Sequence, residues 1–307
     1  MSFLHYLPRR ALLALLLAAA AATTACARNP ASGDDNEFDT SADGRADLSL
    51  PAGIRAERDL AYGPDAQQTL DVFIPLRAQR APIVLMVHGG AWMLGDKAGR
   101  GVATNKVARW LPRGVIVVSV NYRRDRRSPN ALQQADDVAR ALAFVQQRAA
   151  GWGGDGARVL LMGHSSGAHL VSLLSADPGI AERAGAKPVL GTVALDSAVF
   201  DLVEIMERRH YRFYDRVFGK DRQVWLDNSP YHRLQGTPRP MLLVCSSQRS
   251  DSCPQADKFS AKAQAAGARV RVLRVPLKHG EINGQLGLAG DYTSQVEDFL
   301  RSVGVLQ

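Results

Sequence analysis

Hydrophobic positions along the chain form short continuous runs, separated by longer stretches in which apolar residues recur every three or four positions. The continuous runs are 83–87, 115–120, 159–162, 193–195 and 241–244. Short continuous runs rich in β-branched residues are typical of strands buried on both faces, as in a parallel sheet. Two further segments, 68–74 and 270–275, alternate apolar and polar residues, which predicts strands with one more exposed face.

Helical periodicity fills the spaces between these runs. Residues 131–149 place leucine, valine and alanine at three- and four-residue steps, between Pro129-Asn130 and Gly151, and 255–266 and 292–303 show the same pattern. Alternating strands and helices predict a doubly wound α/β domain, which we assign to residues 51–307. Residues 200–236 interrupt the alternation with a long charged and aromatic stretch. We interpret it as a cap-like insertion, with an excursion packed on the sheet as the alternative.

The first 25 residues predict a signal peptide, because Arg9 and Arg10 precede an unbroken run of Ala and Leu over 11–22 that is too short to span a bilayer. Cys26 follows Thr23-Thr24-Ala25, which resembles a bacterial lipobox with Thr23 in place of the usual leucine. Ordinary cleavage in Ala25-Cys26-Ala27 is the alternative. Twin arginines also occur in Tat signals, although the rest of that motif is poor. We therefore expect export to the periplasm, either as a lipoprotein anchored to a membrane through Cys26 or as a soluble periplasmic or secreted protein.

Composition adds two constraints. Residues 26–50 are rich in Asp, Ser, Ala and Gly with few large apolar side chains, which is typical of a disordered linker. The net charge of +8 is spread along the chain, with its densest patches at 123–127 and 207–212. We interpret it as a solvated basic surface, with attraction to anionic polymers or lipid headgroups as the alternative. No nucleic-acid-binding motif accompanies the charge, so we expect no nucleic-acid partner.

One pentapeptide carries a candidate nucleophile. Gly163-His164-Ser165-Ser166-Gly167 has the form G-x-S-x-G, directly after the strand predicted at 159–162 and before a small-residue helix at 168–175. A strand that turns sharply into a helix exposes the serine hydroxyl, and glycines on both sides prevent clashes across the turn. This context predicts that Ser165 is a catalytic nucleophile. His164 and His169, which flank it, are expected to shape a pocket or make hydrogen bonds.

A second motif, His88-Gly89-Gly90-Ala91-Trp92, follows the strand at 83–87. The tetrahedral intermediate of acyl transfer requires backbone N–H groups directed at its oxyanion, and small residues let the backbone come close. We therefore predict oxyanion donors at Gly90 and Ala91, with Ser166 as a third donor from the nucleophile turn.

A base and an acid are needed to activate the serine. In chain order Ser–acid–His, the base is expected after the last strand, where His279 precedes Gly280. Asp251 is the first carboxylate after the strand at 241–244, and we predict that it orients the imidazole. Asp257 is less well placed. Asp196 and Asp201, after the preceding strand, are the reserve candidates for the acid.

Cys245 and Cys253 lie on either side of Asp251 and predict a disulfide in an oxidising compartment, with two reduced thiols as the alternative. Such a bond would stiffen the loop that presents the acid. The sequence contains no paired Cys and His spacing typical of a metal site, and we expect neither a metal nor another cofactor.

Taken together, these motifs resemble the α/β-hydrolase esterases, especially the branch of feruloyl-esterase-like and kynurenine-formamidase-like carboxylesterases. The matching segments within residues 55–303 are Gln68-Thr69-Leu70-Asp71-Val72, His88 to Trp92, Asn121-Tyr122-Arg123, Gly163 to Leu170, Ser229-Pro230-Tyr231, Asp251 and His279. Ala91 departs from the branch, which has a third glycine there. Asp196-Ser197 departs from its frequent Ser-Gly.

The resemblance implies an eight-stranded, mostly parallel sheet whose second strand is antiparallel, and the triad Ser165, Asp251 and His279. It implies a serine hydrolase that cleaves small carboxylic esters through an acyl-enzyme. We expect Trp92, Tyr122, His164 and Phe200 to bind substrate. The alternatives are an aryl-formamidase or amidase with the same triad, and a non-catalytic ligand-binding protein of the cell envelope. The patterns specify neither the natural substrate nor the oligomeric state.

Overall fold

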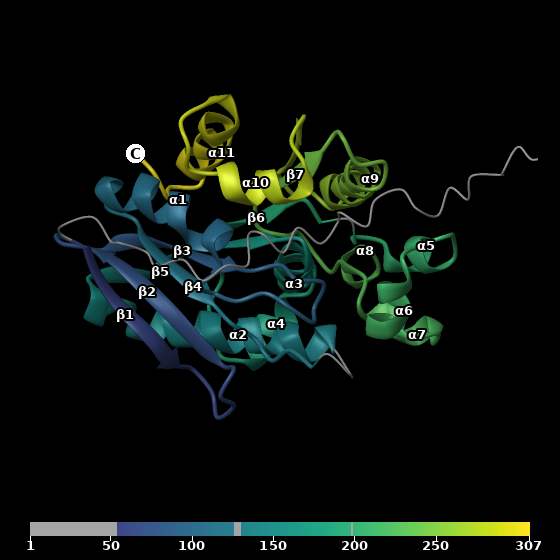
Figure 1. Ribbon diagram of the computed structural model, residues 1–307, viewed down its shortest axis with the longest axis horizontal. Coiled ribbons are helices and arrows are strands. Elements are labelled where there is room, and N and C mark those ends of the chain that lie inside the picture. Colours follow the sequence, from purple (N-terminus) through teal and green to yellow (C-terminus); the bar gives the residue numbers. More distant parts are fainter. Residues whose placement is uncertain (1–53, 126–129, 198) are drawn as a thin grey trace, which may run out of the picture. The chain divides into compact units, whose positions relative to one another are not determined.

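The computed structural model describes residues 54–125, 130–197 and 199–307 (Figure 1). The predicted signal peptide 1–25, the linker 26–50 and the candidate lipidation site Cys26 lie outside the described residues. Among the helices that are described, none has the length and apolar character needed to cross a membrane.

A single eight-stranded sheet forms the centre of the described domain (Figure 1). Its spatial order is β1-β2-β4-β3-β5-β6-β7-β8, and β2 runs antiparallel to both β1 and β4 while the remaining pairs are parallel. This arrangement confirms the expected eight-stranded, mostly parallel sheet with an antiparallel second strand. The strands are β1 (Ile54–Ala61), β2 (Thr69–Pro75), β3 (Ala81–Val87), β4 (Ile116–Val120), β5 (Gly154–His164), β6 (Gly191–Leu195), β7 (Met241–Ser246) and β8 (Val270–Val275).

Helices cover both faces of the sheet. Neighbouring residues of β3 point to opposite faces, so that Ile83, Leu85 and Val87 pack with α2, α3 and α4, while Val84 and Met86 pack with α1, α10 and α11. Figure 1 shows α1, α10 and α11 close together. The main helices are α1 (Arg100–Trp110), α2 (Ala131–Arg148), α3 (Ser166–Ala176), α4 (Pro178–Arg183), α9 (Ser252–Ala265), α10 (His279–Gln285) and α11 (Asp291–Ser302), and two 3₁₀ turns cover Leu111–Arg113 and Ala149–Trp152.

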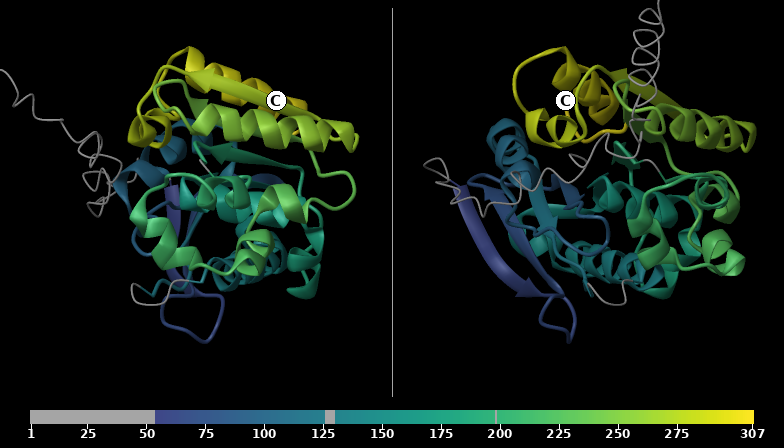
Figure 2. Two further views of the ribbon diagram at one scale, coloured as in Figure 1. Left: turned by 90° about the vertical axis from the view of Figure 1, so that its right-hand side faces the viewer. Right: turned by 45° about the vertical axis from the view of Figure 1, so that its right-hand side comes forward.

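The 200–236 segment connects β6 to β7 through four short helices that gather on one side of the domain and face the viewer in the left view of Figure 2. They are α5 (Leu202–Met206), α6 (Arg212–Phe218), α7 (Arg222–Asp227) and α8 (Pro230–Arg233). The two ends of the insertion are fastened together, because Ser229 Oγ and Tyr231 N both donate to the carbonyl oxygen of Phe200, at 3.0 and 2.8 Å. The insertion packs onto the domain core, because Leu202, Tyr214 and Phe218 belong to the same buried cluster as Trp92 and Leu170.

Helix α1 is absent from the hydrophobic pattern, and its buried face explains why. Lys106 is 1% exposed and occupies that face together with Val102, Val107 and Trp110. Its ammonium donates to the carbonyl oxygen of Gly101 at 3.1 Å and to both oxygens of Asn283 at 2.8 and 2.9 Å. A charged residue on the apolar stripe weakens the helical signal in the sequence.

Candidate active site

Ser165 occupies the sharp turn between β5 and α3. Its backbone angles are φ 54° and ψ −121°, in the left-handed region that non-glycine residues rarely adopt. The turn depends on two glycines: a Cβ on Gly163 would lie 2.3 Å from Gly167 O, and a Cβ on Gly167 would lie 2.4 Å from the carbonyl oxygens of Val87 and His88. The strained serine is therefore held by close backbone packing between β5, β3 and the start of α3.

The Ser165 side chain is only partly buried, and its hydroxyl has no hydrogen-bond partner among the described residues. By contrast, its backbone N–H donates to Leu195 O at 2.9 Å, which continues the ladder between β5 and β6. Ser165 is thus fixed through its backbone while its oxygen remains accessible at the first turn of α3, where unpaired N–H groups favour a developing negative charge.

The loop after β3 comes close to this serine. A Cβ on Gly89 would lie 2.9 Å from Ser165 Cβ and 3.1 Å from His164 Nδ1. Gly90 and Ala91 follow with φ angles of 119° and 49°. Their backbone N–H groups have no acceptor within the described part of the chain. The predicted donors Gly90, Ala91 and Ser166 therefore belong to two backbone segments that meet beside Ser165.

His88 and Tyr122 stabilise this loop through hydrogen bonds to its backbone carbonyl groups. Their rings are stacked with centroids 4.5 Å apart, the Tyr122 hydroxyl donates to His88 O at 3.2 Å, and His88 Nδ1 donates to Gly89 O at 2.6 Å. Burial lowers the pKa of His88 to about 4, so its ring is neutral at neutral pH. Two buried, neutral rings thus fix the carbonyl groups on one side of the loop and leave its N–H groups free.

His279 is the first residue of α10, directly after the β8 connection. Its Nδ1 donates to Asp196 Oδ2 at 2.5 Å. Asp196 follows β6, is 0% exposed, and has a φ of 55°. Its backbone N–H donates to Val244 O at 2.8 Å, so the residue is held by the neighbouring strand β7. The structure thus places a buried carboxylate against the imidazole.

The Asp196 carboxylate accepts three further hydrogen bonds. Ser246 N and Ser252 Oγ donate to Oδ1 at 2.7 and 2.5 Å, and Arg249 Nη1 donates to Oδ2 at 2.9 Å. Burial opposes its ionisation, but the hydrogen bond and charge of His279, the charge of Arg249 and the Ser252 hydroxyl together hold the pKa of Asp196 well below its ordinary value. The carboxylate is therefore ionised, and the roughly four acceptor positions of a carboxylate are all occupied.

Asp251, the acid predicted from the sequence, is not the partner of His279. Its carboxylate oxygens lie 3.4 Å from Nε and Nη2 of Arg249. The position beside the imidazole is occupied by Asp196, which the sequence offered only as a reserve candidate. The prediction of Asp251 is corrected for a physical reason: Arg249 lies between the two carboxylates and pairs with both.

His164 links the histidine to the nucleophile turn. It precedes Ser165, its Nε2 donates to His279 O at 3.0 Å, and the two imidazole centroids are 4.5 Å apart. Burial, assisted by the charge of His279, places the pKa of His164 well below its ordinary value, so this ring stays neutral. The base candidate therefore lies against the residue that precedes the nucleophile candidate.

The side chains predicted to bind substrate are buried in the described structure. Trp92, Tyr122, His164 and Phe200 are 3, 0, 8 and 1% exposed, and each packs against protein groups. Phe200 stacks on Phe259 of α9 with ring centroids 5.0 Å apart. These four side chains are therefore largely enclosed by protein groups, and their contact with substrate stays a prediction.

Trp92 belongs to a buried chain of hydrogen bonds that sequence reasoning left unspecified. Its indole N–H donates to His169 Nδ1 at 3.1 Å, and His169 Nε2 donates to Asn228 O, in the 200–236 insertion, at 2.7 Å. Burial lowers the pKa of His169 to about 4, which preserves the neutral tautomer that this chain requires. His169 thus couples the oxyanion loop, the nucleophile helix and the insertion.

The chain is similar in sequence to several known proteins. Residues 70–198 match the family model described as BD-FAE, a segment that contains Ser165, the oxyanion loop and Asp196. The esterase LipQ of Mycobacterium tuberculosis is 32% identical over 231 residues, which are 68% of this chain and 53% of LipQ. The isoprenylcysteine alpha-carbonyl methylesterase ICME of Arabidopsis thaliana is 26% identical over 239 residues, 71% of this chain and 55% of that protein. The chain has the α/β-hydrolase fold.

Solved structures agree with this fold. A truncated carbohydrate esterase from gut microbiota superposes with a TM-score of 0.70 at 18% identity, over 85% of this chain and 99% of that one. Esterase B of Lactobacillus rhamnosis, inhibited by a tributyrin phosphonate, gives a TM-score of 0.67 at 20% identity, over 84% and 87%. The first curated relatives are longer, and the chain matches only 30 to 55% of their length. A position in the feruloyl-esterase-like branch is consistent with these likenesses.

Two further features of the described structure bear on its chemistry. The sulfur atoms of Cys245 and Cys253 lie 2.07 Å apart, at the distance of a disulfide bond. Across the residues with described positions, no group of three or more His, Cys, Asp or Glu side chains could hold a metal ion.

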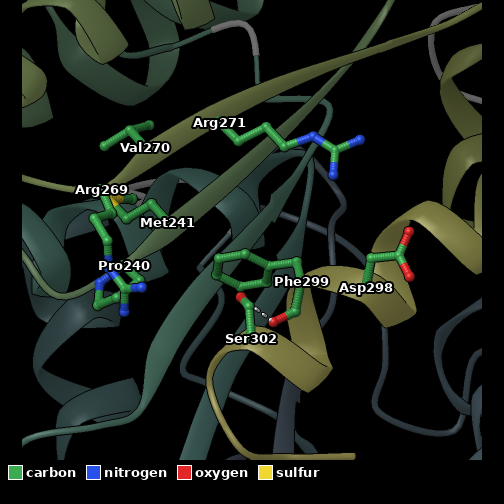
Figure 3. Close-up of a pocket in the computed structure, with 8 residues that line it drawn as sticks. All are labelled: Pro240, Met241, Arg269, Val270, Arg271, Asp298, Phe299 and Ser302. Carbon is green, nitrogen blue, oxygen red and sulfur yellow. Dashed lines mark hydrogen bonds between the residues drawn. The ribbon is translucent and has the colours of Figure 1, made fainter.

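A pocket lies at the amino ends of the strands, opposite to the ends that carry Ser165 and Asp196 (Figure 3). It is lined by residues at the amino ends of β7 and β8, including Met241 and Val270, and by Phe299 and Ser302 of α11. Ser165 and Asp196, by contrast, follow the carboxyl ends of β5 and β6. Ligands of open α/β sheets bind at the carboxyl ends of the strands, so this pocket does not belong to the candidate active site.

Proposed function

We propose that the protein is a serine carboxylesterase that hydrolyses carboxylic esters through an acyl-enzyme, with Ser165 as nucleophile, His279 as base and Asp196 as acid. The observation that carries this proposal is the buried Asp196–His279 pair beside the strained, accessible Ser165. The named relatives, which are esterases, support the choice of an ester substrate.

In the first half of the proposed reaction, the Ser165 oxygen attacks the ester carbonyl and gives its proton to His279 Nε2. Because Nδ1 already donates to Asp196, the imidazole is held in the tautomer that leaves Nε2 free to accept that proton. The ionised carboxylate then stabilises the imidazolium. In enzymes without bound substrate, the hydrogen bond between nucleophile and base is often long and tightens only in the Michaelis complex.

The negative charge that develops on the carbonyl oxygen is received by the N–H groups of Gly90, Ala91 and Ser166. When the intermediate collapses, His279 returns its proton to the leaving alcohol, and an acyl-Ser165 ester remains. In the second half a water molecule attacks this ester, His279 takes the proton of the water, and the carboxylic acid is released as Ser165 regains its hydrogen.

Labelling with a fluorophosphonate probe tests this proposal, because such probes react with activated serine nucleophiles. We expect labelling of the native enzyme and its loss in Ser165→Ala and His279→Gln, with parallel loss of p-nitrophenyl acetate hydrolysis. Persistent labelling in Ser165→Ala would overturn the assignment. Turnover of N-formylkynurenine above that of p-nitrophenyl acetate would instead indicate an aryl-formamidase with the same triad.

We further propose that the enzyme works outside the cytoplasm, where the Cys245–Cys253 disulfide forms, and that Cys26 carries a lipid anchor. The basic start and Ala/Leu run of residues 1–25 support export, and disulfides persist in oxidising compartments. Mass spectrometry of the protein isolated from its native host tests both parts. We expect a lipidated N-terminal Cys26 and no free thiol at Cys245 or Cys253. An intact residue 1–25 segment would contradict export, and an unmodified mature N-terminus would contradict the anchor.

A further inference from the structure

Arg249 has an unusual place for a cation in a proposed esterase site. Its Nη1 lies 2.9 Å from Asp196 Oδ2 and 2.8 Å from His279 Nδ1, so guanidinium and imidazole meet at the same carboxylate oxygen. The proposed mechanism creates a positive charge on His279, and a fixed cation at this distance opposes it. The Arg249 side chain is 14% exposed, so water screens this effect only in part.

Asp251 supplies the opposite charge. Its oxygens lie 3.4 Å from Nε and Nη2 of Arg249, on the side of the guanidinium away from the imidazole contact. Two carboxylates, Asp196 and Asp251, therefore pair with the guanidinium that contacts the imidazole. The net charge beside His279 is that of one carboxylate, as in an ordinary triad, although three ionised groups contribute to it.

We propose that Arg249 and Asp251 form an opposed pair of positioning residues that sets the acid limb of the pH–rate profile of the esterase. Arg249 directs Asp196 at Nδ1 and disfavours protonation of His279, and Asp251 offsets the second effect. This inference rests on the proposed function. It assigns a positioning role to Asp251, the residue that the sequence predicted as the acid of the triad.

The other ionisable groups around the imidazole differ in kind from this pair. His164 of β5 and Tyr292 of α11 are neutral, because burial lowers the pKa of the first and raises the pKa of the second. Lys106 of α1 acts on His164, and burial lowers the pKa of Lys106 to about 7. Lys278 and Glu281 adjoin His279 along the chain and bond to each other at the exposed start of α10. All of these groups are common to the variants below, so their effects cancel in a comparison.

Removal of the positive charge of Arg249 and removal of the negative charge of Asp251 should shift the acid limb in opposite directions. In Arg249→Met, two uncompensated carboxylates favour the imidazolium, so the acid limb of kcat/KM should move up by about one pH unit. In Asp251→Asn, the uncompensated guanidinium disfavours it, so the limb should move down by a similar amount. In the Arg249→Met, Asp251→Asn double variant, the acid limb should lie near its native pH. Arg249→Lys keeps the positive charge, so the acid limb should stay at its native pH while kcat falls. Arg274→Met, which removes an exposed arginine of β8 paired with Asp257, is the matched control with an unchanged limb.

The experiment measures p-nitrophenyl acetate hydrolysis against pH for these variants, and the titration of the His279 ring by NMR in the same proteins. Opposite shifts of the limb and of the ring titration support the inference. Shifts in the same direction, or none, overturn it, because a purely structural role of Arg249 would lower activity at every pH. If Arg249→Met does not fold, Asp251→Asn and Arg249→Lys still test the inference, through a downward shift of the limb in the first and an unshifted limb in the second. An inactive native enzyme would remove the proposed esterase function, and the NMR titration would then still test the charge pair.

Discussion

The imidazole of His279 and the carboxylate of Asp196, 2.5 Å apart, connect the ends of two strands that are not neighbours, since β7 lies between β6 and β8. The loop after β7 fills the space between them and donates to the carboxylate through Ser246, Arg249 and Ser252. The acid is therefore presented by β6 and enclosed by the β7 loop.

Replacement of each aspartate by asparagine should distinguish the roles of Asp196 and Asp251. Asp196→Asn leaves the shape of the site but lets the imidazole adopt the wrong tautomer, so kcat should fall by about 10³- to 10⁴-fold. Asp251→Asn should lower kcat by less than about tenfold at the optimum pH, because it removes a charge that acts through Arg249. Steady-state kinetics on p-nitrophenyl acetate measure both. The reverse ranking would restore Asp251 as the acid.

Gly89→Ala should impair catalysis more than folding. The new Cβ would lie 2.9 Å from Ser165 Cβ, so the serine or the oxyanion loop has to shift by a few tenths of an ångström. A displacement of this size at the reacting centre typically costs about tenfold or more in kcat. Gly151→Ala is the control, because its Cβ would meet nothing within 4 Å. Equal kcat in the two variants would show that the approach of the loop to the serine is not critical.

Loss of the Cys245–Cys253 disulfide should reduce both stability and activity. The bond closes a loop that contains Ser246, Arg249 and Ser252, the three donors to Asp196 besides His279. Chain entropy predicts a loss of about 2–3 kcal/mol in the free energy of unfolding for a loop this short. We expect a lower kcat in the Cys245→Ser, Cys253→Ser double variant and in the native enzyme treated with dithiothreitol. The double variant should not respond to the reductant, and an unchanged kcat in it would contradict a role of the bond in holding the donors.

Acidification should destabilise the fold through two buried histidines. The pKa of both His88 and His169 is lowered from 6.5 to about 4 by burial, so between these pH values the unfolded chain binds protons that the folded chain does not. Stability is therefore lost as the pH falls from about 6.5 towards 4, by about 3 kcal/mol per histidine. Urea unfolding at several pH values checks the slope. His169→Gln, which cannot titrate, should show a shallower slope, and an unchanged one would refute the contribution of His169.

Much of the architecture could be predicted because continuous apolar runs become strands buried on both faces. The run 83–87 is the carboxyl-terminal part of β3, and 241–244 begins β7. Helix α1 was not predicted, because Lys106 interrupts its apolar stripe, and no local signal in the sequence reveals that Asn283 will accept hydrogen bonds from its ammonium group. The helical content of the 200–236 insertion was also hidden, since its four helices are each no longer than seven residues.

The nucleophile turn could be predicted and the acid could not, for a physical reason. The turn at Ser165 is local, and its glycines are required by contacts within a few residues and with the end of β3. The partner of His279 depends on which of two loops reaches the imidazole, which is a property of the packed sheet. The sequence did contain one signal: Asp196-Ser197 departs from the Ser-Gly of the related branch at the end of a predicted strand.

The ladder between β5 and β6 continues into the site through Ser165 N to Leu195 O, and the ladder between β6 and β7 continues into it through Asp196 N to Val244 O. Spacing between nucleophile and acid is therefore dictated by sheet geometry and not by any surface connection. We therefore expect changes in the connecting helices α6 and α7 to leave the spacing between Ser165 and Asp196 unchanged.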